Sequence, residues 1–134
     1  MSDKTIKAND LHNRGYNCAQ AVACVFAEDM GMSEEDVFRI MEGFGFGMGT
    51  MGTCGAVSAM AAVVGMNRSD RNLEKPRSKK DSYKDMRSLT EKFHEKNGSI
   101  MCRDIKGVDT GVVLRSCPGC IEDCVEILEA YLGR

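Results

Sequence analysis

Seven cysteines are the residues of this 134-residue sequence best suited to chemistry. A cysteine thiolate is a nucleophile, and it is also the usual ligand of structural zinc and of iron–sulfur clusters. Four of the seven stand where a helix or turn is expected to begin: Cys18, Cys54, Cys102 and one member of the pair Cys117 and Cys120. If these positions meet at one end of a helical bundle, their thiolates form a metal centre. The alternative is a set of scattered reduced thiols.

Cys117 and Cys120 form a CxxC pair at the start of the last expected helix. Positions i and i+3 lie on one face of a helix, so the two thiols could bind one metal, form a reversible disulfide, or share a face without chemical purpose. Cys117, taken as the residue that caps this helix, is expected to be the more reactive thiol. The pair does not follow a strand in a βαβ pattern, as a thioredoxin-like motif would require, and Ile121 excludes c-type haem attachment because that motif needs a histidine. A metal-free protein in which Cys117 or Cys120 carries out thiol–disulfide exchange therefore remains an alternative to a metal centre.

Cys24 and Cys124 differ from the other cysteines because they lie within apolar stretches of expected helices. A free cysteine in such a place packs like a small hydrophobic residue. We therefore expect these two to be structural.

The segment from Gly43 to Gly65 must position Cys54, and it contains seven glycines and no charged residue. Glycine lets the backbone adopt positive φ and lets another group approach closely. The composition predicts a pliable loop that delivers Cys54 to the first turn of a buried helix, where unpaired N–H groups favour a thiolate. Gly52 and Gly55, on either side of Cys54, are the expected cofactor-binding positions, because their N–H groups could approach a bound centre.

The remaining pattern predicts an all-α fold, with residues 1–134 forming a single-domain bundle of about five helices and the glycine-rich loop before the third. Only residues 112–114 suggest a strand. The expected helices run from Asn9 or Asp10 to Met30, from Glu34 to Glu42 after Ser33, from Gly55 to about Val64, from Pro76 to Gly98, and from Pro118 onward, with a short turn at Cys102.

Composition limits the partners and the location. A net charge of -2, from 18 basic and 20 acidic residues, argues against binding to nucleic acid. No apolar run approaches the roughly 20 residues that span a bilayer, and no secretory signal is recognisable, so a cytoplasmic location with reduced thiols is expected. The loop carries apolar side chains that form a homodimer surface or are covered by the polar linker and the last helix: Phe44, Phe46, Met48 and Met51.

The text around the cysteines resembles a known family, named for its pattern C_GCAxxG_C_C and described as putative redox-active proteins. The resemblance covers residues 8–132 and is carried by NCAQAV at 17–22, GFGFGMGTMGTCGA at 43–56, FHEKNGSIMCRDIKG at 93–107 and CIEDCVEILEAYL from Cys120. The central segment departs from the family pattern, reading Cys-Gly-Ala and ending in Ala59. The helix text favours Cys120 as the last family cysteine, which makes Cys117 an additional thiol.

The resemblance implies an all-helical protein with a redox role. A related domain in split-Soret cytochromes accompanies a non-haem iron–sulfur centre, and by that analogy Cys18, Cys54, Cys102 and Cys120 are candidate ligands of a [2Fe–2S]-type cluster. The expected function is therefore electron transfer to a partner that the sequence does not identify. A zinc-stabilised helical interaction domain is a further alternative.

Overall fold

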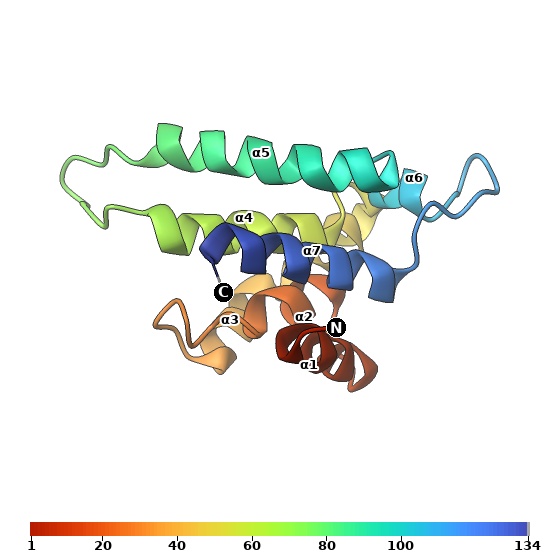
Figure 1. Ribbon diagram of the computed structural model, residues 1–134, viewed down its shortest axis with the longest axis horizontal. Coiled ribbons are helices and arrows are strands. Elements are labelled where there is room, and N and C mark those ends of the chain that lie inside the picture. The colour runs from red at the N-terminus through yellow and green to blue at the C-terminus, as the bar shows by residue number, and fades with distance from the viewer. Residues whose placement is uncertain (134) are drawn as a thin grey trace.

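The computed structural model describes residues 1–133, and seven α-helices and no strand form within them (Figure 1). The elements are α1 (Asp3–Asn13), α2 (Cys18–Cys24), α3 (Glu34–Met41), η1 (Glu42–Phe44), η2 (Gly47–Met51), α4 (Gly55–Arg68), α5 (Lys79–Asn97), α6 (Cys102–Ile105) and α7 (Cys117–Leu132). The all-α expectation is confirmed. Five helices were too few, because the first expected helix is two helices and the turn at Cys102 is itself helical.

The helices are arranged around α4 and α7, which lie side by side in the middle of the molecule (Figure 1). Helix α5 covers one side of this pair, and α1, α2 and α3 lie on the other. Small side chains allow the close packing of α2 on α4, since Ala19 and Ala23 of α2 and Ala56 and Ala59 of α4 are all fully buried. None of the helices in residues 1–133 combines the length and the apolar character needed to cross a membrane.

The break between α1 and α2 corrects the prediction of one helix from Asn9 or Asp10 to Met30. Gly15 adopts a φ of +116°, which an L side chain rarely tolerates, and this turns the chain out of α1. Asn17 then opens α2, because its side chain accepts a hydrogen bond from the N–H of Gln20 while the Gln20 side chain accepts from the N–H of Asn17. The break places Cys18 at the first position of a new helix.

Two other helix starts differ from the expectation. Helix α5 begins at Lys79 and not at Pro76, because the Asp70 carboxylate accepts from the N–H of Arg77 and holds the preceding residues in a loop. Helix α7 is capped by Ser116, whose hydroxyl accepts from the N–H of Gly119, so Cys117 is the first helical residue and not the cap.

Candidate functional site

Five cysteines line one cavity of about 180 Å³ at the end of the bundle where α6 and the start of α7 lie (Figure 1). We call this space the thiol cavity. The five are Cys18, Cys54, Cys102, Cys117 and Cys120. All four cysteines expected to converge are present, and both members of the CxxC pair face the cavity. All seven cysteines of the chain are free thiols.

Cys18 reaches the cavity because its helix start is tied to η1 and because Gly55 leaves room for its sulfur. The Asn17 side chain donates a hydrogen bond to the carbonyl of Glu42 over 2.9 Å. A Cβ added at Gly55 would lie 2.6 Å from the Cys18 sulfur and 2.8 Å from the carbonyl oxygen of Phe44. Only glycine at position 55 is therefore compatible with the position of Cys18.

Cys54 and Cys102 are brought together by their backbones. The N–H of Cys54 donates to the carbonyl of Ile100 and the N–H of Cys102 donates to the carbonyl of Gly52, both over 2.7 Å. These bonds enclose an isolated antiparallel bridge between Thr53 and Met101. The bridge joins the glycine-rich segment to α6. Gly55 lines the cavity, whereas Gly52 contributes this carbonyl and does not line the cavity.

The glycine-rich segment before this bridge has an unusual backbone. Four consecutive residues, 46–49, adopt positive φ, and two of them, Phe46 and Met48, carry side chains. A non-glycine residue in this region costs on the order of 1–3 kcal/mol, and such residues are concentrated at functional sites. Gly47 must be glycine, since a Cβ there would meet the backbone of Gly52.

The electrostatics of the cavity favour a thiolate at Cys54. The Cys120 thiol donates a hydrogen bond to Cys54, and this lowers the pKa of Cys54 to about 7 although burial opposes the shift. The N–H groups of Val57 and Ala56, in the first turn of α4, and the positive charge of Lys106 act in the same direction. Of these two thiols, Cys54 is therefore the one that ionises first, and Cys120 the one that keeps its proton.

The neighbouring thiols stay protonated more readily. The hydrogen bond to Cys54 and burial raise the pKa of Cys120, and burial is the main cause of the raised pKa values of Cys18 and Cys102. Cys124 is fully buried, and burial raises its pKa well above the usual value. It lies outside the cavity lining, as expected for a structural thiol.

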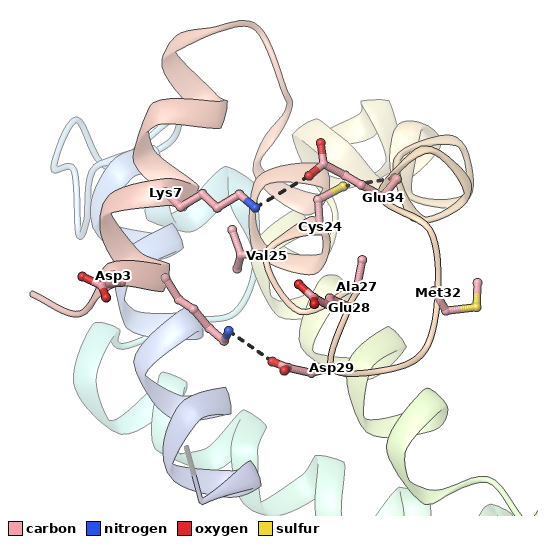
Figure 2. Close-up of a pocket in the computed structure, with 10 residues that line it drawn as sticks. Asp3, Lys7, Cys24, Val25, Ala27, Glu28, Asp29, Met32 and Glu34 are labelled. Carbon is pink, nitrogen blue, oxygen red and sulfur yellow. Dashed lines mark hydrogen bonds and ion pairs between the residues drawn. The ribbon is translucent and has the colours of Figure 1, made fainter.

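Cys24 is also removed from the thiol cavity. It lines a different cavity, of about 340 Å³, between α1, the turn after α2 and the start of α3 (Figure 2). Its thiol donates to the carbonyl of Glu34 over 3.8 Å, and burial raises its pKa to about 11. Lys7 pairs with the Glu34 carboxylate at 3.9 Å, and Lys4 pairs with Asp29 at 3.1 Å (Figure 2).

Sequence reasoning missed two cations that line the thiol cavity, Lys106 and Arg115. The Lys106 ammonium lies 3.6 Å from the Cys117 sulfur. The signal was present in the sequence, since Lys106 follows Cys102 by four residues and Arg115 precedes Cys117 by two. His12 also lines the cavity.

Apolar side chains surround this end of the molecule. Phe46 lines the cavity and is 50% exposed, and Met48 in the same loop is 53% exposed. The polar linker does not cover them, because it connects α4 and α5 at the opposite end of the molecule (Figure 1). Other exposed apolar side chains in the neighbouring segments are Phe44, Met101, Val108, Val112, Val113 and Leu114.

The thiols surround a space and do not meet at a point. Within residues 1–133, no group of three or more His, Cys, Asp or Glu side chains is arranged to hold a single metal ion. Five thiols around one cavity are the donor type that iron–sulfur clusters use, so the residues present fit such a group.

A comparison of the sequence with protein families matches residues 16–131 to the family described as "Putative redox-active protein (C_GCAxxG_C_C)". The match covers most of the chain and includes all five cysteines of the thiol cavity. The chain belongs to this family of redox-active proteins. Neither a curated protein nor a solved structure is significantly similar to it.

Proposed function

We propose that the thiol cavity holds an iron–sulfur cluster and that the protein transfers electrons through it. The observation that carries this proposal is the gathering of Cys18, Cys54, Cys102 and Cys120 around a single cavity of about 180 Å³. A zinc ion is bound at about 2.3 Å from each sulfur, so it would fill only a small part of this space. When bound, a cluster supplies a one-electron couple whose potential depends on charge, hydrogen bonds to sulfur and exposure.

The chain's own residues prepare the site for such a group. The N–H groups at the start of α4 and the Lys106 charge favour a thiolate at Cys54, which is the form that ligates a metal. The bridge between Thr53 and Met101 fixes the backbones that carry Cys54 and Cys102. Phe46 lines the cavity and is half exposed, so a partner that contacts this side chain would lie beside the site.

A second candidate function, metal-free thiol–disulfide exchange, is favoured by the contact between Cys54 and Cys120. The Cys54 thiolate would attack an external disulfide and expel one of its sulfurs as a thiolate. Cys120 would then give its proton to the expelled thiolate and attack the Cys54 sulfur of the mixed disulfide, which releases the second sulfur as a thiolate and leaves a Cys54–Cys120 disulfide. This geometry favours Cys54 as the attacking group, whereas the sequence suggested Cys117 or Cys120.

Anaerobic purification with metal, acid-labile sulfide and thiol analysis separates the two. Iron and sulfide in stoichiometric amounts, with a visible absorption that bleaches on reduction, support the cluster. A protein without iron that reversibly loses two thiols on oxidation, with Cys54 and Cys120 joined in a peptide map, supports exchange. Stoichiometric zinc would support a structural metal and would contradict both redox proposals.

A further inference from the structure

Among the Lys, Arg, Asp and Glu side chains that could line the thiol cavity, only cations are present. They are Lys106 and Arg115, and no Asp or Glu is found among the described residues of its lining. A site built from thiolates carries negative charge, and its reduced form carries more than its oxidised form because it has gained an electron. Two cations at such a site therefore affect its reduced form most.

Lys106 lies beside several of the thiols. Its ammonium donates to the Cys117 sulfur over 3.6 Å and lies 5.5 Å from the centre of the Phe46 ring. It also contributes to lowering the pKa of Cys54 and opposes the effect of burial on the pKa of Cys102. The charge of Lys106 therefore reaches three of the five cavity thiols.

Arg115 also lines the cavity, and the fold fixes its position. Its Nε and one terminal nitrogen each donate to the Asp123 carboxylate over 3.1 Å, and Asp123 is only 2% exposed. A Cβ added at Gly119 would lie 2.5 Å from the Arg115 Nε, so glycine makes room for the guanidinium. The Asp123 carboxylate is the main cause of the raised pKa of Arg115, and Cys120 contributes to it.

We infer that Lys106 and Arg115 are the counter-charges that set the reduction potential of the thiol cavity, with Asp123 and Gly119 as the residues that position Arg115. This inference rests on the proposed redox function. A fixed positive charge stabilises the centre more after it has gained an electron than before. Removing either cation therefore lowers the reduction potential, and replacing one cation by another preserves it.

The test compares reduction potentials of the anaerobically purified full-length protein and its variants. Lys106→Met is expected to reduce the equilibrium constant for accepting an electron about tenfold, which is a drop of about 59 mV for a one-electron couple. Lys106→Arg restores the potential. Lys75→Met is the matched control, because it removes the same charge from the exposed connection at the opposite end of the molecule (Figure 1). Arg115→Met gives a second drop, which includes the effect of leaving the Asp123 carboxylate with Lys96 as its remaining cation.

Iron and sulfide contents are measured on the same samples, so that the proposed cluster and the assignment of the counter-charges are tested separately. If the wild-type protein contains no cluster, the proposed cluster is wrong. The Cys54–Cys120 dithiol–disulfide couple is then titrated in the same variants. Uptake of two electrons and one proton by that disulfide gives one thiolate and one thiol, so cations raise its potential too. Equal potentials for Lys106→Met, Arg115→Met and the wild type, in whichever couple the protein carries, overturn the assignment of the counter-charges.

Discussion

At the scale of single residues, the seven thiols fall into three environments. Five line the thiol cavity, Cys124 is buried in α7, and Cys24 lines the separate cavity beside Lys7 and Glu34 (Figure 2). Because the environments differ, substitutions of the same type, cysteine to serine, should have different effects. This provides matched comparisons within one chain.

We expect Cys54→Ser to abolish cluster binding and redox activity, and Cys24→Ser to leave both intact. Cys54 has the lowered pKa and the backbone contacts of a ligand, whereas Cys24 hydrogen bonds to a carbonyl outside the thiol cavity. Iron and sulfide content per chain is the measurement, with circular dichroism to confirm that both variants fold. Equal loss in the two variants would contradict this division of roles.

The metal-free reduced protein should release its first thiol proton near neutral pH. The pKa of Cys54 is lowered to about 7, so its thiolate forms where an ordinary thiol, with a pKa near 9, is still protonated. The folded state therefore binds fewer protons than the unfolded state between these values, and the contribution of Cys54 to stability increases with pH across that window. Ultraviolet thiolate absorbance against pH measures the step, and its persistence in Cys54→Ser would refute the assignment.

At the scale of the elements, the start of α4 is the most constrained part of the site. Gly55 opens this helix and lines the thiol cavity, and a Cβ added to it would collide with the Cys18 sulfur and the Phe44 carbonyl oxygen. Ten residues later in the same helix, Gly65 has open space around its Cα. The two glycines therefore serve different purposes in one element.

Replacing each glycine by alanine should change stability in opposite directions. Gly55→Ala places a methyl group 2.6 Å from the Cys18 sulfur and is expected to cost about 1–3 kcal/mol, with loss of the cluster. Gly65→Ala is expected to stabilise the protein by about 0.5–1 kcal/mol, because alanine is the better helix former and nothing lies within 4 Å. Urea unfolding of the two variants checks the signs. A neutral Gly55→Ala would show that Cys18 is not held as described.

Local signals predicted some helix limits and missed others. As the sequence indicated, α3 begins after Ser33, which caps it. Helix α5 ends at Asn97, before Gly98 with its positive φ. Pro76 was misleading, since the N–H of Arg77 donates a hydrogen bond to the carboxylate of Asp70, seven residues earlier, and this bond decides where α5 begins. The Gly15 break was missed because apolar residues continue at helical spacing on its far side. The left-handed backbone of residues 46–49 follows from tertiary contacts that no local pattern reports.

At the scale of the whole molecule, a buried carboxylate ties together three parts of the fold. Asp123 of α7 accepts hydrogen bonds from Lys96 at 2.6 Å, Asn97 at 3.1 Å and Arg115 at 3.1 Å. These donors come from the end of α5 and from the loop before α7. The same group therefore positions a cation of the thiol cavity and fastens α5 to α7.

Asp123→Asn should lower the free energy of unfolding at neutral pH and change it little at acidic pH. Burial alone would raise the pKa of Asp123, but hydrogen bonds from Arg115, Lys96 and Asn97 lower it below the usual value. Its stabilising effect is fully present above about pH 4 and is lost as the pH falls through the lower folded value. We expect a cost of about 2 kcal/mol, reduced from that of a fully buried pair because Arg115 and Lys96 reach solvent.

Urea unfolding of the wild type and Asp123→Asn, at neutral pH and below about pH 4, measures this difference. A gap between the two proteins that stays constant on acidification would show that the carboxylate charge is not the cause. Glu74→Gln, at an exposed position of the connection between α4 and α5, controls for the change in net charge.

The convergence of the cysteines was predictable, because residues at helix starts gather at the ends of a bundle. Cys18, Cys54, Cys102 and Cys117 each stand at or next to a helix start in the structure. The geometry that unites them was not predictable, since the bridge between Thr53 and Met101 joins segments far apart in the sequence. The same holds for the cations, since Arg115 is held by the Asp123 carboxylate and the Lys106 ammonium lies 5.5 Å from the centre of the Phe46 ring.

The graded burial of the thiols also makes the protein a reporter of its own unfolding. Partly exposed Cys117 can be alkylated in the native state, whereas Cys124, with no exposed surface, becomes reactive only when α7 leaves the core. The ratio of the two labelling rates at one pH, corrected for the different reactivities of the two thiols, therefore measures the free energy of opening that helix, without an engineered label.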